Sequence, residues 1–267
     1  MSDACPLIAT NALTISVGQR TLVRHLTTNV NAGEVWCILG ANGAGKTLFL
    51  NTLVGLRKAE SGTILFSGRA LDQWSGIEAA RVRAFLPQHF HDAFSATVLD
   101  TVLMGRHPHL SRWAWESESD RDVALAALHT VGLSGMAQRD ITTLSGGERQ
   151  RAAIAALLAQ DAPLLLLDEP VAHLDLRHQI TVLAHLASLA RAREKAVIFS
   201  AHDLNLAFRF ATHAMLFHGD GVVVTGTINE VMNEAALSLA FDYPVAQFKV
   251  GEKSFFAATN GEIGNDG

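Results

Sequence analysis

The sequence has few cysteines and no apolar run long enough to cross a membrane. Its 267 residues include two cysteines, Cys5 near the start and Cys37 in a run that reads as a buried strand, so we expect no disulfide. No apolar stretch approaches the roughly 20 residues that a membrane helix needs. The opening residues, MSDACPLIAT, lack the charged-then-apolar pattern of a secretory signal. These absences favour a protein of the reducing cytoplasm.

An excess of basic residues is also missing. Lysine and arginine together number 21 against 26 acidic residues, which gives a formal net charge of −5. Non-specific binding to nucleic acid needs a positive patch or stripe, so we expect no nucleic-acid partner. The chain shows no long heptad run, internal repeat or low-complexity linker. A chain of this length then forms a full core with one or two subdomains.

The glycines, in contrast, gather in one informative motif. Residues 40–47 read GANGAGKT and fit the pattern G-x-x-x-x-G-K-[ST]. The motif follows an apolar run over 35–39 and precedes a helical pattern over 46–53, which is the strand–loop–helix setting of a phosphate-binding loop. Lys46 is expected to reach the β- and γ-phosphates, and the hydroxyl of Thr47 to bind Mg²⁺. The residues expected to bind the nucleotide here are Gly40, Ala41, Asn42, Gly43, Ala44, Gly45, Lys46 and Thr47.

A second motif places two carboxylates after an unbroken apolar run. Residues 164–170 read LLLLDEP, and four consecutive leucines suit a central parallel strand that is covered on both faces. Asp168 then emerges at the carboxyl end of that strand, where ligands bind in open α/β sheets. A carboxylate at this position can hold the Mg²⁺ shell. Glu169 is better placed to act as general base on an attacking water.

Between these two motifs lies LSGGERQ over residues 144–150. By itself it is a Ser/Gly turn that opens a helix, with Ser145 at the N-cap and Glu148 three residues later. Gly146 and Gly147 expose backbone N–H groups at the helix start, a geometry that binds anions.

With these motifs in this order, the chain resembles the ATP-binding-cassette (ABC) ATPases over nearly its whole length. Gln88 in LPQ matches that family's Q-loop, and LSGGERQ matches its signature motif. Asp175 ends AHLD, which matches the D-loop, and His202 in SAHD matches the switch histidine. The resemblance implies an α/β fold of the P-loop NTPase class, a RecA-like core with an antiparallel β subdomain and an inserted helical subdomain.

The hydrophobic pattern and the resemblance together divide the chain. Residues 1–87 and 162–250 form the ATP-binding core, within one ABC domain over about 7–245. Residues 88–161 form the inserted helical subdomain, with helices at 97–104, 119–131 and 148–158 from their apolar spacing. Residues 251–267 form a C-terminal tail.

The resemblance further implies a head-to-tail homodimer with ATP and Mg²⁺ held between the copies. Each ATP lies on the phosphate loop of one copy and is capped by Ser145, Gly146 and Gly147 of the other. His202 contacts the γ-phosphate and orients the water with Glu169, and these two residues form the expected catalytic pair. The remaining expectations are ATP contacts from Gln88 and Asp175, and Mg²⁺ ligands from Thr47, Gln88 and Asp168.

Three positions depart from the family pattern. Val17 stands where an aromatic residue usually stacks on adenine, and Leu48 where a hydroxyl residue is common. Val171 stands where threonine is frequent. We therefore expect weaker base stacking and one missing contact to the α-phosphate, with the charge-stabilising groups retained.

Two classes of ABC protein remain as hypotheses: the ATPase subunit of an importer, and a soluble ATPase acting on nucleic acid or ribosomes. A single cassette without coiled coil or fused membrane helices favours the importer. It implies separate transmembrane permease subunits and a peripheral position on the cytoplasmic face of the inner membrane. A periplasmic or external substrate-binding protein would be an indirect partner. Residues 97–110, 144–160 and 174–179 are similar to importers of siderophores, haem and cobalamin, and leave the substrate open.

Two other groups of residues allow alternatives. His89, His91, His107 and His109 form two H-x-H pairs, which could bind a transition metal or simply flank loops that face a partner. Trp113 and Trp115 are either core residues of the helical subdomain or exposed anchors for a partner helix.

Overall fold

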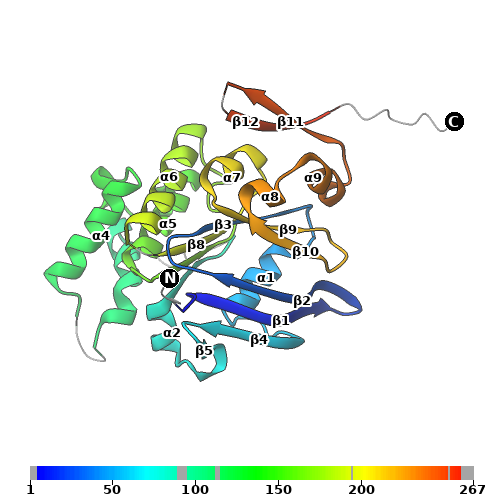
Figure 1. Ribbon diagram of the computed structural model, residues 1–267. Coiled ribbons are helices and arrows are strands. Elements are labelled where there is room, and N and C mark those ends of the chain that lie inside the picture. Colours follow the sequence, from blue (N-terminus) through cyan, green and yellow to red (C-terminus); the bar gives the residue numbers. More distant parts are fainter. Residues whose placement is uncertain (1–4, 89–94, 112–114, 194, 252, 260–267) are drawn as a thin grey trace.

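The computed structural model describes residues 5–88, 95–111, 115–193, 195–251 and 253–259. Within this part the chain forms two large sheets with helices between and around them (Figure 1). The strands are β1 (Ile8–Val17), β2 (Arg20–Val30), β3 (Val35–Gly40), β4 (Ser61–Phe66), β5 (Arg69–Ala70), β6 (Arg83–Leu86), β7 (Leu164–Leu167), β8 (Ala196–Ser200), β9 (His213–Phe217), β10 (Val223–Thr227), β11 (Val245–Val250) and β12 (Lys253–Ala258). The α-helices are α1 (Lys46–Leu53), α2 (Gly76–Val82), α3 (Val98–Leu103), α4 (Glu118–Thr130), α5 (Gly146–Ala159), α6 (Leu176–Arg193), α7 (Leu204–Phe210), α8 (Ile228–Val231) and α9 (Glu234–Phe241).

The larger sheet has the strand order β10-β9-β3-β8-β7-β6. Strands β3, β6, β7, β8 and β9 run parallel, and β10 pairs antiparallel with β9 at one edge. Strands β3, β7 and β8 are buried at every position. Because a parallel sheet is covered on both faces, such strands read as continuous apolar runs. The strands predicted at 35–39, 164–167 and 196–200 are confirmed.

The smaller sheet has the order β2-β1-β4-β5 and is antiparallel. Helix α1 lies between the two sheets, where Phe49 and Leu50 are completely buried. Helices α5, α6, α7 and α9 pack on the other face of the parallel sheet. The phosphate loop therefore joins the central strand β3 to a helix that is held on both sides.

Helices α3, α4 and α5 pack against one another beside the parallel sheet (Figure 1). Thr97, Ser117 and Ser145 each cap the following helix with a reciprocal pair of hydrogen bonds to an acidic residue three positions later. Each cap satisfies backbone N–H groups that the first turn leaves unpaired. The helices predicted around 97–104, 119–131 and 148–158 are confirmed, with boundaries set by these caps.

The C-terminal segment departs from the sequence-based expectation. Residues 253–258 of the predicted tail form β12, which pairs antiparallel with β11. The hairpin lies beside α7 and α9, on the side away from the smaller sheet (Figure 1). The helices α2, α7, α8 and α9 also escaped prediction, since elements of four to eight residues carry too little periodicity to be recognised.

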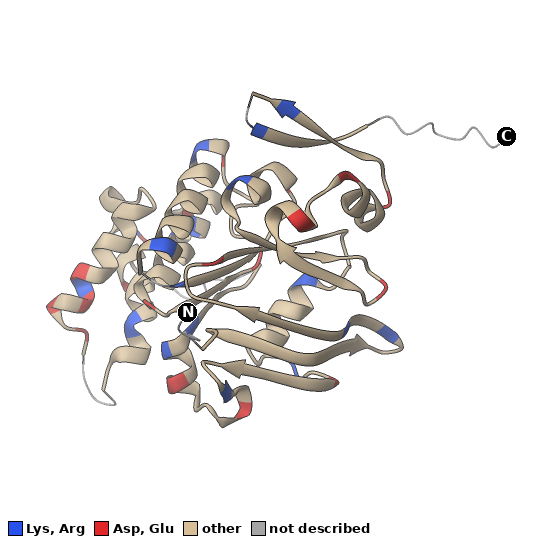
Figure 2. Ribbon diagram, viewed as in Figure 1, with Lys and Arg blue, Asp and Glu red and all other residues tan. Residues whose placement is uncertain are grey.

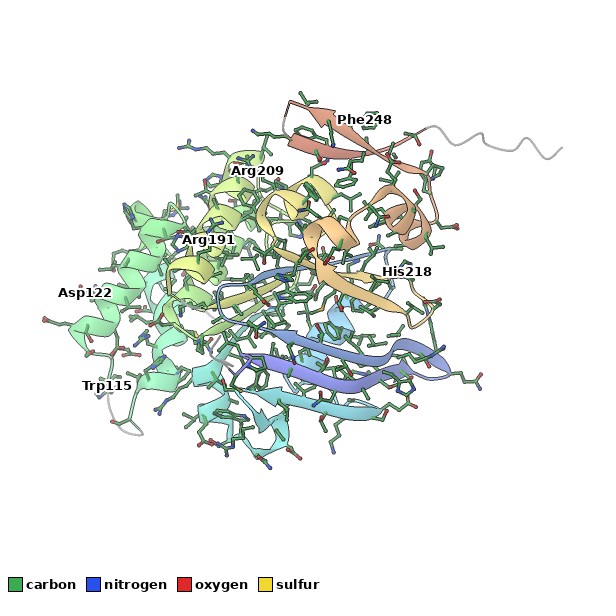
Figure 3. The ribbon with its side chains drawn as sticks, viewed as in Figure 1. Trp115, Asp122, Arg191, Arg209, His218 and Phe248 are labelled. Atoms are coloured by element: carbon green, nitrogen blue, oxygen red, sulfur yellow. The ribbon has the colours of Figure 1, made fainter. Side chains whose placement is uncertain are left out.

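The surface adds three observations. Lys, Arg, Asp and Glu positions are dispersed over the sheets and the helices (Figure 2). Trp115 is 91% exposed just before α4 (Figure 3), so the core interpretation is wrong for this residue. Trp113 lies outside the described residues.

Of the helices in the described segments, none is both long and apolar enough to cross a membrane.

Candidate nucleotide-binding site

The phosphate loop needs glycine for its backbone path. Gly40 has φ +147°, and a Cβ atom there would lie 2.7 Å from the carbonyl oxygen of Phe217. Gly45 has φ +108° at the N-cap position of α1. An L side chain rarely adopts these angles, so the GANGAGKT pattern follows from the geometry of the turn. Ala44, within the loop, is buried.

Lys46 is the first residue of α1 and is folded back over the loop. Its Nζ donates hydrogen bonds to the carbonyl oxygens of Gly40 at 2.8 Å and Ala41 at 3.2 Å. Burial lowers the pKa of Lys46, while the carboxylates of Glu169 and Asp168 raise it. Two of the three ammonium donors serve the loop, which leaves one for an anionic ligand.

Asp168 stands directly after β7 and is 1% exposed. Its Oδ1 accepts a hydrogen bond from Ser200 Oγ at 2.5 Å, while its Oδ2 is buried without a partner. An unpaired carboxylate oxygen in a protein interior is costly unless a ligand or water completes it. Mg²⁺ prefers such oxygen ligands, often through its own waters. The residues present therefore fit a magnesium ion.

Glu169 and His202 form a direct pair. The Oε1 of Glu169 lies 2.5 Å from Nε2 of His202, and the two side chains are 13% and 46% exposed. Glu169 has φ +49°, a left-handed conformation that is uncommon for a residue other than glycine, and its N–H donates to Ser200 Oγ at 2.8 Å. Local strain of this kind gathers at functional sites. The pair joins an imidazole directly to a carboxylate that is placed to act as a base on a bound water.

One cavity of about 410 Å³ brings together half of the predicted site residues. It is lined by Asn42, Gly43, Gly45, Lys46, Thr47, Leu48, Gln88, Glu169 and His202. These side chains come from α1 and its loop and from the ends of β6, β7 and β8, which meet at the carboxyl edge of the parallel sheet. Ligands of α/β sheets bind at this edge.

The predicted signature residues lie outside this cavity. Ser145 accepts a hydrogen bond from the Glu148 N–H, and its own N–H and hydroxyl donate to the Glu148 carboxylate at 2.8 Å. Ser145 and Gly146 are exposed, and Gly147 packs near the His173 carbonyl. The phosphate-binding loop and the helix start that carries the signature motif therefore lie at different places on the chain.

Asp175 also lies outside this cavity. Its carboxylate accepts from Nδ1 of His178 at 2.8 and 2.9 Å and from the His178 N–H at 2.9 Å. These hydrogen bonds lower the pKa of Asp175. The other ring nitrogen of His178 lies 2.6 Å from Nη1 of Arg151 in α5, so residue 175 is tied to the signature helix of its own chain.

Sequence reasoning missed Ser200. Its hydroxyl donates to Asp168 Oδ1 and accepts from the Glu169 N–H, so it positions both carboxylates. A hydroxyl residue that ends an otherwise apolar buried strand, AVIFS, was the available signal.

The two histidines of the H-x-H pairs that the structure describes, His107 and His109, contact different partners. Nε2 of His109 lies 2.7 Å from the Gln160 carbonyl oxygen, and His107 lies 4.0 Å from Glu116. The described segments hold no group of three or more His, Cys, Asp or Glu side chains suited to a metal ion. His89 and His91 lie outside the described residues.

A glycine-rich phosphate loop and a Glu–His pair line one cavity, and a buried carboxylate follows the parallel strand β7; together they define a P-loop nucleoside triphosphatase. The ABC transporter family matches residues 23–172 of this chain. The chain therefore belongs to the ABC transporter family and is an ABC-type ATPase.

Known proteins similar to this chain share an import function in their names. The hemin import ATP-binding protein of Streptomyces coelicolor is 40% identical over 244 residues, which cover 91% of this chain and 85% of that protein. The petrobactin import ATP-binding protein of Bacillus anthracis is 37% identical and covers 85% and 83%. The cobalamin import ATP-binding protein of Halobacterium salinarum is 38% identical and covers 82% and 54%.

Solved structures agree on the fold. A putative metal-chelate type ABC transporter in an inward-facing conformation superposes with a TM-score of 0.82 at 30% identity, over 95% of this chain and 97% of that one. A dimeric ATP-binding cassette bound to ADP and Pi gives a TM-score of 0.73 at 27% identity, over 83% and 98%. The predicted fold class is confirmed.

Proposed function

We propose that this chain is the ATP-hydrolysing subunit of an importer that takes up an iron chelate, haem or cobalamin through a separate membrane permease. The observation that carries the proposal is the cavity in which Lys46, Glu169 and His202 meet. The names of the relatives support the importer class, and the similar metal-chelate transporter structure supports it independently.

The working unit is a head-to-tail homodimer. Ser145, Gly146 and Gly147 present a helix start away from the cavity of their own chain, and anions bind at such a start. A second copy, turned head to tail, supplies this helix start to the phosphates bound by the first. The similar dimeric cassette with ADP and Pi supports an assembly of two cassettes.

The residues of the phosphate-binding loop and of the cavity have different roles in this proposal. Lys46 and the loop N–H groups hold the β- and γ-phosphates, and Thr47, Gln88 and Asp168 would hold Mg²⁺. When bound, Mg²⁺ neutralises the charge that builds on the phosphate oxygens. Glu169 takes a proton from the attacking water, and His202 keeps that water and the γ-phosphate in line.

Gln88 connects the cavity to the membrane partner. It lies two residues after the end of β6 and lines the nucleotide cavity. ATP binding closes the dimer because the contacts across it exist only in the closed state. The closure is passed from the region around Gln88 to the permease on the membrane, with this chain on the cytoplasmic face.

Transport by the complete assembly tests this function. The chain is co-purified with its permease and reconstituted in vesicles with the external binding protein, and uptake of labelled cobalamin, haem and a ferric siderophore is measured. We expect ATP-dependent uptake of one of these classes, abolished in the Glu169→Gln variant. ATP hydrolysis without uptake of any of them would contradict the importer assignment and leave a soluble ABC ATPase as the alternative.

A further inference from the structure

His202 lies in a short connection whose two ends are held very differently. It follows β8, which ends at Ser200 inside the parallel sheet, and precedes α7, which begins at Leu204. Strand β8 is buried at all positions and pairs with strands on both sides. The position of His202 relative to Glu169 therefore depends on what holds α7.

Helix α7 depends on its neighbours for stability. It has seven residues, and a helix that short is not stable in water without tertiary packing. Asp203 caps it, with Oδ1 accepting from the N–H groups of Asn205 at 2.8 Å and Leu206 at 3.0 Å. Leu206 and Ala207 are buried and anchor one side of the helix on the core.

The C-terminal hairpin holds another side of α7. Nδ2 of Asn205 donates to the Phe256 carbonyl oxygen at 3.1 Å, and Oδ1 of Asn205 accepts from the Phe256 N–H at 2.8 Å. This pair of bonds satisfies both backbone groups of one residue of β12. The Phe256 ring is 3% exposed and meets the Phe208 ring edge-on, with centroids 5.2 Å apart.

The hairpin is fixed at its base by α9. Oε1 of Glu234 accepts from the Gln247 N–H at 2.6 Å, and Oγ of Ser238 accepts from the Val245 N–H at 2.9 Å. An isolated two-stranded hairpin is at best marginally stable in water. Its outer face is uncovered, since Phe248 is 49% exposed (Figure 3). The order of the hairpin therefore comes from its inner contacts with α7 and α9.

We propose that the C-terminal hairpin is a positioning element for hydrolysis. Through Asn205 and Phe256 it holds α7 in place, and α7 keeps His202 against Glu169. Catalytic groups must be held within about 0.5 Å of their working geometry by the residues around them. His202, with a side chain that is 46% exposed, receives little such support from packing of its own. The inference rests on the proposed roles of His202 and Glu169.

The test measures ATP hydrolysis by the full-length chain in complex with its permease, across ATP concentrations. Asn205→Ala removes both bonds to Phe256 while leaving the buried face of α7 intact. We expect kcat to fall about tenfold, because a misplaced catalytic group costs up to about 100-fold in rate. The KM for ATP stays unchanged, since the loop of Lys46 is untouched. Phe256→Ala should change kcat in the same direction.

Phe248→Ala is the matched control, because it removes an aromatic ring from the outer face of the same hairpin. We expect it to leave kcat unchanged. Hydrogen exchange of the α7 amides reports on the anchor itself, and should become faster in Asn205→Ala and stay as it is in Phe248→Ala.

A double variant separates positioning of His202 from a general structural role. If the hairpin acts through His202, Asn205→Ala lowers the residual rate no further once His202→Ala is present. An equal loss in both backgrounds would overturn the inference, as would a raised KM with unchanged kcat, or unchanged kcat despite faster exchange in α7. Wild-type protein that hydrolyses no ATP would instead contradict the proposed function.

Discussion

Two parts of this chain, each proposed to contact a different one of the two nucleotides in the dimer, are stabilised in opposite ways. The cradle, residues 40–47 with Asp168, Glu169 and His202, holds buried charges whose hydrogen bonding is incomplete. Asp168 keeps an unpaired buried oxygen, and burial lowers the pKa of Lys46. The lid, Ser145–Gly147 at the start of α5, is exposed at Ser145 and Gly146, and Ser145 is hydrogen-bonded to Glu148.

The difference shows which half depends on the ligand. The cradle places polar groups where a phosphate and a cation can complete their bonding, and such groups destabilise the state without ligand. The lid is already folded by its capping box and needs nothing from a nucleotide in its own chain. This division suits a site shared between two copies, in which one copy binds first and the second closes over it.

The largest expected effect comes from removing the proposed general base, Glu169. We expect Glu169→Gln to lower the hydrolysis rate about 1000-fold, because a positioned general base contributes about 10²- to 10⁴-fold. ATP binding survives, and the variant accumulates as a dimer with ATP. Phosphate release and light scattering after size-exclusion chromatography measure the two effects.

Glu118→Gln is the matched control for this change, since Glu118 is an exposed glutamate in the first turn of α4. It should hydrolyse ATP at the wild-type rate. Rapid turnover by Glu169→Gln, or a variant that stays monomeric with ATP and Mg²⁺ even beside the permease, would contradict the shared site.

The second effect tests whether the cradle and the lid come from different copies. Lys46→Ala disables the cradle, and Ser145→Arg blocks the lid, so each variant alone should be inactive. An equal mixture forms heterodimers in which one of the two sites is intact. We expect the mixture to regain about a quarter of the wild-type rate, since half of the dimers are mixed and each has one working site.

Nucleotide binding to the separate variants controls this mixing experiment. Ser145→Arg should bind ATP as wild type does, whereas Lys46→Ala should lose about 100-fold in affinity, because a hydrogen bond to a charged group contributes about 1.5–3 kcal/mol. If the mixture is no more active than either variant alone, the cradle and the lid act within one chain.

The smallest effect concerns the stability of the helices that carry the lid. Bonds from Ser117 and Arg106 lower the pKa of Asp120 from 3.8 to about 2. A lowered carboxyl pKa stabilises the folded state above pH 4, and this stabilisation is lost as the pH falls toward 2. We expect Asp120→Asn to reduce the free energy of unfolding by about 1–2 kcal/mol at pH 7 and by less at pH 3.

Urea unfolding at both pH values measures this difference. Asp122→Asn is the control, because Asp122 lies exposed on the same helix (Figure 3) and should change stability little. ATP affinity should remain unchanged in both variants. A stability loss that grows on acidification would contradict the role of the Asp120 carboxylate.

Motifs with strict local geometry were predictable, and long-range partners were not. The loop over residues 40–47 and the four leucines before Asp168 are recognisable because a turn needs glycine and a covered strand needs continuous apolar residues. Ser200 was missed because its role depends on β8 lying beside β7. Trp115 shows the limit in another way, since its exposure follows from packing that spacing alone does not reveal.

The sequence by itself determined the phosphate loop, the carboxylates after β7 and the capped start of α5, since each depends on residues that are neighbours along the chain. Only the tertiary structure decided that Gln88, Glu169 and His202 share one cavity while Ser145 stays outside it. It also decided that β12 returns to hold α7. Contacts between residues about 30 to 50 positions apart depend on how sheets and helices stack, and local sequence patterns do not record that stacking.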